Sequence, residues 1–167
     1  AKGCANTPVV LQVPGMAVTL GRAPIDQLPS TFHIATFTSA SNVTVHLPDS
    51  LRSVLRRALG ASGVVDVVTA VLPGPFTEVV VLSFWDPVGG QKVPVEGLLD
   101  PIVLAFPAAT ADLYQPVPDW YLCTYEAAGQ WAPEGLWLAA TPSALLCHTT
   151  HLSTFTVEPV VGIEAVE

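Results

Sequence analysis

Short runs of β-branched and other apolar residues, separated by proline and glycine, recur along the whole sequence. The 167 residues include 16 prolines and 12 glycines, and Val and Thr are abundant between them. Because proline and glycine interrupt regular elements and β-branched side chains suit a pleated sheet, this pattern favours short strands and turns. We therefore expect a mainly β fold, an antiparallel β-sandwich. The expected strands cover residues 9–13, 16–20, 31–38, 42–47, 64–72, 79–85, 92–95, 102–106, 120–126, 135–140, 144–147 and 154–157.

Two of these runs are long and almost entirely apolar. The composition of residues 64–72 and 79–85 predicts strands that are buried on both faces. The range 42–47 alternates instead, which is typical of a strand with one buried face. Its apolar side chains on that face are Val43, Val45 and Leu47.

Only one segment has the periodicity of a convincing helix. Its apolar residues form one stripe at helical spacing: Leu51, Val54, Leu55 and Leu59. Asp49 or Ser50 is placed to cap the helix, and Gly60 is placed to end it. At this length the whole chain, residues 1–167, is expected to form a single domain.

Charged side chains are scarce and mostly acidic. Six Lys and Arg face 14 Asp and Glu, which gives a net charge of −8. Six cations cannot build a basic surface that neutralises many phosphates, so we expect no nucleic-acid partner. The apolar stretches are broken by Pro, Asp or Gly well short of the ~20 residues that span a bilayer. The sequence starts at Ala1 and shows no secretory leader.

The cysteine count is odd, so at least one of the three cysteines lacks a partner within the chain. Cys4 is the expected leftover thiol, with a partner outside this sequence. Asn42-Val43-Thr44 is an acceptor sequence for N-glycosylation in a secreted chain. The cysteines and histidines lack the spacing of a zinc site, so we expect no metal and no cofactor.

A nucleophile and a base lie close together near the end of the chain, in His151-Leu152-Ser153. The Ser153 hydroxyl can reach the Leu152 carbonyl carbon through a five-membered ring. A hydroxyl needs a base to become a nucleophile, and an imidazole has a suitable pKa for that role near neutral pH. A nucleophile and a base placed in this way are the minimum requirement for a chain that cleaves its own backbone.

The residues before this triplet extend the pattern. They are Cys123, Tyr125, Trp131 and Cys147. With them, residues 120–157 resemble the GPCR proteolysis site, the C-terminal part of the GAIN (autoproteolysis-inducing) domain of adhesion receptors and polycystin-type proteins. That family shows a Cys and an aromatic, then Trp, Gly-Cys, and Cys-x-Cys-x-His-Leu-Ser/Thr before a short apolar strand. Leu136 and Thr149 stand here in place of two of its cysteines.

The resemblance implies a disulfide between Cys123 and Cys147, because the two absent cysteines pair with each other in the family. It also implies a GAIN-like sandwich on the extracellular side of a membrane protein, in an excised fragment that lacks the larger helical part. The implied partners are the chain's own C-terminal strand after cleavage, a membrane-embedded remainder of the parent protein and an extracellular protein ligand.

The reaction that the resemblance implies is a single self-cleavage of the Leu152–Ser153 bond. His151 takes the Ser153 hydroxyl proton, Oγ attacks the Leu152 carbonyl, and water hydrolyses the resulting ester. Thr149 and Thr150 are candidates to orient the site or to stabilise the oxyanion. A strained turn is expected at the bond, because forming an ester from a relaxed amide is uphill. The strand over 154–157 should stay hydrogen-bonded afterwards.

The neighbouring aromatic residues have simpler expected roles. Tyr125, Trp131 and Trp137 should support the loop, the two tryptophans by packing in the core, and His148 should lie on the surface. A second function hypothesis keeps the fold but not the cleavage, as a structural or adhesion module. A third, a hydrolase of other substrates, is weaker. The chain has no Gly-x-Ser-x-Gly elbow and no acidic residue near His151 in sequence.

Overall fold

The computed structural model describes residues 9–35, 42–60, 63–74, 77–107, 121–141 and 143–159. Its helical elements are a 3-10 turn, η1 (Ile25–Gln27), and one α-helix, α1 (Asp49–Leu59). The strands before the last hairpins are β1 (Val9–Val13), β2 (Met16–Pro24), β3 (Thr31–Ala35), β4 (Asn42–His46), β5 (Val64–Leu72), β6 (Val79–Trp85) and β7 (Ile102–Pro107). The remaining strands are β8 (Tyr121–Ala127), β9 (Gln130–Ala132), β10 (Leu136–Thr141), β11 (Ala144–Thr149) and β12 (Thr154–Pro159).

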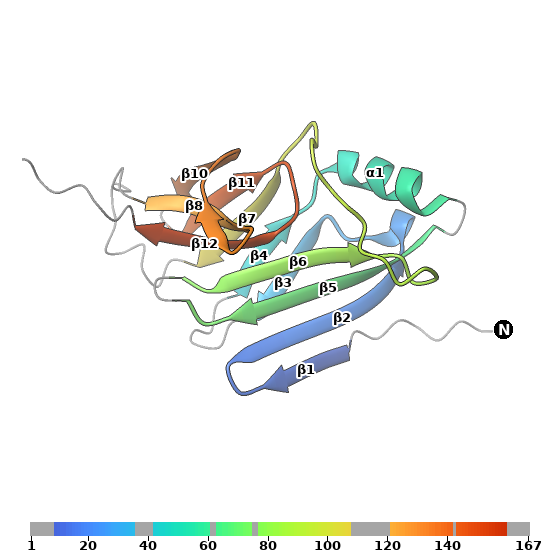
Figure 1. The fold of residues 1–167 in the computed structure, drawn as a ribbon, viewed down its shortest axis with the longest axis horizontal. Helices are drawn as coiled ribbons and strands as arrows, with labels where there is room; N and C mark the ends of the chain where they lie inside the picture. Colours follow the sequence, from blue (N-terminus) through green and yellow to red (C-terminus); the bar gives the residue numbers. More distant parts are fainter. Residues whose placement is uncertain are drawn as a thin grey trace, which may run out of the picture.

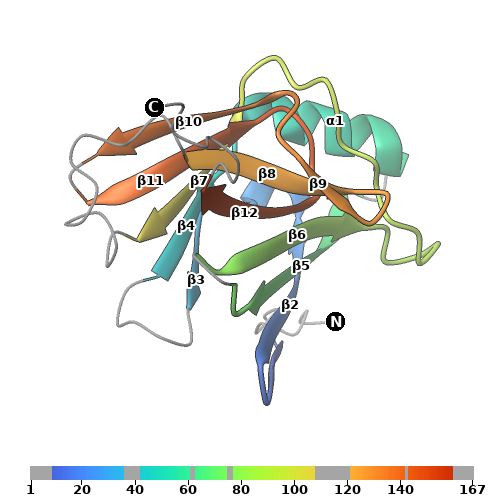
Figure 2. The same cartoon turned by 60° about the vertical axis from the view of Figure 1, so that its left-hand side comes forward.

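Two antiparallel sheets make up the fold, which confirms the prediction of a mainly β, sandwich-like protein with one α-helix. The larger sheet has the order β1-β2-β5-β6-β12-β8-β9, and the smaller has the order β10-β11-β7-β4-β3. Figures 1 and 2 show the two layers and place β12 between β6 and β8. The last strand of the described chain is therefore an inner strand of the larger sheet.

One continuous hydrophobic core fills the space between the sheets. Its largest fully buried side chains include Phe84, Phe106 and Phe155, and the helix adds Leu51 and Leu55. The three apolar side chains expected on one face of the range 42–47 are all buried, as the alternation predicts. Burial also alternates along most of β5 and part of β6. No residue of either strand is exposed, so the prediction that both faces are buried is confirmed where consecutive residues are buried, at 69–71 and 82–84. Elsewhere it is wrong, because alternate positions of the two strands are only half-buried.

Two other expectations need correction. Residues 92–95 form no strand, and an isolated bridge joins Lys92 to Trp85. The next residues form individual backbone hydrogen bonds: the Val93 N–H donates to the Phe84 carbonyl, and the Val95 carbonyl accepts from Leu152. Pro94 has no N–H to offer a ladder, which fits this irregular path. The helix has Pro48 as its N-cap and no side-chain cap, so neither Asp49 nor Ser50 caps it, whereas Gly60 ends it as expected.

Some sequence expectations fall outside the described residues. They concern Cys4, the end of the strand expected over 31–38, Trp120, and most of the loop expected over 107–119. Within the part of the chain that the structure describes, no helix has the length and apolar character required to cross a lipid bilayer.

Candidate functional site

The proposed cleavage bond lies in a short link between the two sheets. β11 ends at Thr149 in the smaller sheet, and β12 begins at Thr154 in the larger one. The triplet His151-Leu152-Ser153 therefore crosses from one layer to the other, and both ends of the link are held by hydrogen-bonded strands (Figure 2). A cut in this link would separate no strand from its sheet.

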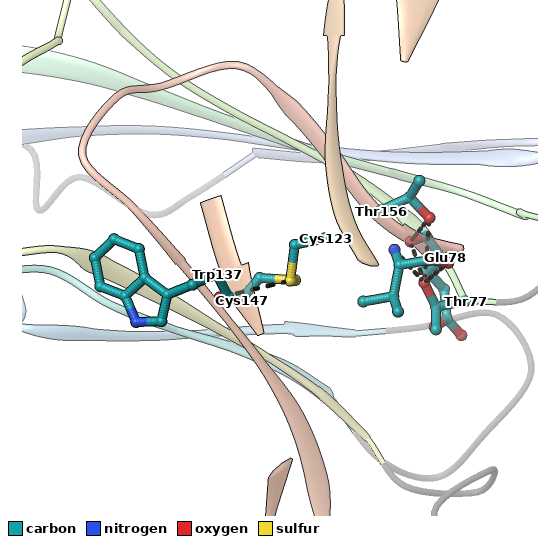
Figure 3. Close-up of a disulfide and its surroundings, with 7 residues drawn as sticks. Thr77, Glu78, Cys123, Trp137, Cys147 and Thr156 are labelled. Atoms are coloured by element: carbon teal, nitrogen blue, oxygen red, sulfur yellow. Dashed lines mark hydrogen bonds between the residues drawn. A yellow bond between two sulfur atoms is a disulfide. The ribbon is translucent and has the colours of Figure 1, made fainter. Parts of the chain in front are cut away.

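β12 is anchored on both sides. It pairs with β8 from Phe155 to Pro159, but with β6 only at Thr154 and Phe155. Beyond those residues a buried side chain, Thr77, continues the contact: the Val157 N–H donates to Thr77 Oγ1 at 3.1 Å. The hydroxyl oxygens of Thr77 and Thr156 lie 3.2 Å apart, and Figure 3 shows the two side chains facing each other. Sequence reasoning did not find Thr77, because its partners lie about 80 positions away.

A disulfide joins Cys123 on β8 to Cys147 on β11 (Figure 3), as the resemblance implies. The bridge links the larger sheet to the smaller one. Both cysteines precede Leu152 in the chain. A fragment that begins at Ser153 would consequently keep no covalent link through this disulfide.

The His151 ring is enclosed by aromatic side chains and one hydroxyl. Tyr125 meets it edge to face, with ring centroids 4.5 Å apart, and Phe155 lies at 5.9 Å. Thr149 Oγ1, which is fully buried, lies 3.2 Å from His151 Nδ1. Burial lowers the pKa of His151, although the nearby Glu96 carboxylate acts in the opposite direction. A neutral imidazole is thereby favoured, which is the form that can act as a base.

The Ser153 hydroxyl is engaged elsewhere. Ser153 Oγ donates to the backbone carbonyl of Glu126 at 3.1 Å, and within the described residues no hydrogen bond joins it to His151. His151 Nε2 is buried and has no hydrogen-bond partner. The base and the nucleophile are thus near each other in sequence but are not in direct hydrogen-bond contact.

The expected strain at the cleavage bond does not take the form of a left-handed backbone. Among the described non-glycine residues only Ala128 has a positive φ, of 52°, in the turn between β8 and β9. His151, Leu152 and Ser153 therefore all avoid the conformation that L-residues adopt at a cost.

A loop from the middle of the chain holds the link in place. The Leu152 N–H donates to the Val95 carbonyl at 3.0 Å, and the Leu98 N–H donates to the Thr150 carbonyl at 3.1 Å. Beside these contacts lies an open pocket of about 610 Å³. Its lining includes Lys92, Glu96, Tyr125, Glu134, His151 and Leu152. The residues before the cleavage bond are accordingly reachable by solvent from this side.

The remaining candidates lie apart from the link or have other roles. Trp131 and Trp137 are 41% and 47% exposed, so the prediction that they pack in the core is wrong. Trp137 stacks on the half-buried His148, at 5.1 Å between ring centroids. Trp137 is exposed between two half-buried leucines of β10 and so lies on the outer side of that strand. The aromatic side chain in contact with His151 at this place is Tyr125. Asn42 opens β4, but its side chain lies outside the described residues.

Metal ligands do not gather at this site. Among the described residues, no group of three or more His, Cys, Asp and Glu side chains is arranged to hold a metal ion.

The sequence was also compared with known proteins. No family model matches it, and no curated protein matches it either.

Proposed function

We propose that this chain is an autoproteolytic domain that cleaves its own Leu152–Ser153 bond once. The observation that carries the proposal is the position of this bond. It lies in the link between the sheets, next to a half-buried imidazole whose lowered pKa favours the neutral form, and directly before an inner strand. A module that cuts itself and keeps its fold needs that combination, because both products remain held by hydrogen-bonded strands.

The reaction starts with a rotation of the Ser153 side chain. Its hydroxyl leaves the Glu126 carbonyl and turns toward His151, which accepts the proton at Nε2. Oγ then bonds to the Leu152 carbonyl carbon. His151 returns the proton to the departing Ser153 nitrogen, and the C–N bond breaks to leave an ester. Holding the reacting atoms together is worth up to ~7–11 kcal/mol in well-oriented cases.

Hydrolysis of the ester completes the reaction. Water adds to the Leu152 carbonyl carbon and the Ser153 oxygen departs, which yields a Leu152 carboxylate and a Ser153 residue with free amino and hydroxyl groups. The open pocket that borders Leu152 and His151 gives water a path to this side of the link. No metal or cofactor takes part in the proposed reaction.

The same proposal assigns the chain to the extracellular side of a membrane protein, as a GAIN-like module with a proteolysis site at residues 120–157. The disulfide supports an oxidising compartment. Its partners would be its own β12 after cleavage, a membrane-embedded remainder of the parent protein and an extracellular protein ligand. Asn42 would then be available for glycosylation.

A second candidate function is a structural or adhesion module with the same fold and no cleavage. One observation favours it: the Ser153 hydroxyl donates to Glu126 and not to His151. If that arrangement persists in solution, the nucleophile never meets its base. The two candidates differ in one measurable property, the covalent continuity of the chain after residue 152.

Denaturing electrophoresis of purified variants separates these candidates. The unsubstituted chain should yield a large fragment and a small one, whereas Ser153→Ala and His151→Ala should give one intact band. Ser153→Cys should still cleave, because a thiol supplies a nucleophile at the same position. Ser143→Ala, on an exposed turn residue, is the matched control and should cleave like the unsubstituted chain. An intact band for the folded, unsubstituted chain would rule out self-cleavage.

A further inference from the structure

Among the described residues, the Thr149 hydroxyl makes its hydrogen-bond contacts with a single residue, His151. Thr149 Oγ1 accepts from the His151 backbone N–H at 3.2 Å and donates to the His151 carbonyl oxygen at 3.0 Å. It also lies 3.2 Å from the ring atom His151 Nδ1. Thr149 is fully buried at the end of β11, so water does not compete for these contacts.

The capacity of a hydroxyl decides the direction of the third contact. A threonine hydroxyl has one proton to donate and two lone pairs that accept. The His151 carbonyl can only accept, and at 3.0 Å it is the nearest of the three contacts, so we assign the hydroxyl proton to it. One lone pair then accepts the His151 amide, and the other faces Nδ1, an arrangement that calls for a proton on Nδ1.

We infer that Thr149 is a positioning residue that fixes the tautomer of His151, with the proton on Nδ1 and the lone pair on Nε2. This inference rests on the proposed function, since a tautomer matters here only if His151 acts as a base. In a neutral imidazole one nitrogen carries hydrogen and the other accepts. Thr149 thereby directs the accepting nitrogen away from itself.

The surroundings of Nε2 agree with this assignment. Nε2 is buried without a hydrogen-bond partner, so nothing in the described structure occupies its lone pair. Tyr125 and Phe155 confine the ring, which keeps it from swinging away from Thr149. A proton acceptor is thus held in one orientation, two residues before Ser153, until the serine hydroxyl rotates toward it.

Under this assignment Thr149 orients the site and is not the oxyanion donor, two roles that the sequence left open. Its only proton is directed at the His151 carbonyl, whereas the oxyanion of the proposed reaction forms on Leu152. Thr149 therefore acts through His151 and does not touch the reacting carbonyl.

Two substitutions at Thr149 test the inference. Thr149→Val keeps the shape of the side chain and removes the hydroxyl, and Thr149→Ser keeps the hydroxyl. Each is made in the otherwise unsubstituted chain for cleavage rates, and in a Ser153→Ala chain for nitrogen NMR of the histidine ring. The Ser153→Ala chain stays intact, so the tautomer can be read without cleavage.

In the Ser153→Ala chain, His151 should carry its proton on Nδ1, and the added Thr149→Val substitution should reduce that population. The cleavage rate should fall about tenfold with Val, the loss expected for one hydrogen bond of about 1.4 kcal/mol, and should recover with Ser. A proton on Nε2 in the Ser153→Ala chain would overturn the inference. So would a Val variant that keeps both the tautomer and the rate.

The two proposals fail in different ways. If the unsubstituted chain does not cleave, the proposed function is wrong, while the NMR measurement still decides whether Thr149 fixes the tautomer. If the chain cleaves and the Val variant keeps both the tautomer and the cleavage rate, the function stands and the role of Thr149 is wrong.

Discussion

The Thr77 hydroxyl accepts a hydrogen bond from the Val157 amide at 3.1 Å and so takes the place of a backbone partner beside β12. This matters because β6 pairs with β12 at only two residues. After a cut at Leu152, the C-terminal fragment would be held by β8, by that short pairing and by Thr77.

Thr77→Val should therefore loosen the fragment without stopping cleavage. The substitution leaves the buried Val157 N–H without a partner, which costs about 1–3 kcal/mol. The fragment should dissociate about tenfold faster or more, as measured by size-exclusion chromatography of the cleaved, native protein. Thr77→Ser keeps the hydroxyl and should retain the fragment; equal retention by all three proteins would refute this role of Thr77.

Gly97 offers a test of the loop that holds the link. It has a φ of +64°, and a Cβ there would meet no atom within 4 Å, so Gly97→Ala adds only the cost of the left-handed backbone, about 1–2 kcal/mol. The loop should then hold Leu152 and Thr150 less firmly, and cleavage should slow. Gly90→Ala is matched in φ, at +67°, and in open space. If both variants cleave at the same rate, the loop does not position the link.

Removing the disulfide should destabilise the fold. Cys123 and Cys147 are separated by 24 positions, and closing a loop of that size is worth about 3 kcal/mol in the chain-entropy treatment. The double substitution Cys123→Ala with Cys147→Ala should lower the free energy of unfolding by about that amount. Urea denaturation in a Ser153→Ala background, with and without reductant, measures it. An equal free energy of unfolding for the oxidised chain, the reduced chain and the double variant would show that the bridge does not stabilise the fold.

The pH dependence of folding stability follows from the partial burial of His151. Its folded-state pKa lies below the unfolded value of about 6.5, so near that pH the unfolded chain binds more protons. Its contribution to stability is complete above the unfolded pKa and is lost as the pH falls toward the folded pKa.

The same shift predicts the pH profile of cleavage. The rate should rise with pH as His151 becomes neutral and level off, with a midpoint below about 6.5. The profile is measured by stopping the reaction at several times at each pH and reading the cleaved fraction from denaturing gels. A midpoint above 6.5, or a rate that does not change with pH, would argue against His151 as the base.

Much of the fold could be predicted because alternation and turn residues act locally. Val43, Val45 and Leu47 follow a period of two, and all three are buried. The bounds of β5 and β6 were also predicted, whereas their burial was predicted only in part, since composition alone does not say how fully the second face is covered. The strand predicted over 92–95 is wrong for a related reason: two alternating valines, Val93 and Val95, also suit a loop that packs on the core, where both are buried.

The site was only partly predictable. His151, Leu152 and Ser153 are adjacent in sequence, and a triplet of that kind is visible without a structure. Their partners depend on how the strands cross between the sheets. The Glu126 carbonyl meets Ser153 across 27 positions, and nothing in the local sequence marks it. The precise orientation of Thr149 toward His151 likewise depends on the turn after β11.

The most direct test of self-cleavage is the intact mass of the folded protein after denaturation, with and without prior hydroxylamine treatment. Hydroxylamine attacks esters, so it should speed the appearance of two chains and leave a hydroxamate on Leu152. The account predicts one polypeptide that ends at Leu152 and one of fifteen residues, from Ser153 to Glu167. A single mass for the whole chain, unchanged by hydroxylamine, would contradict it.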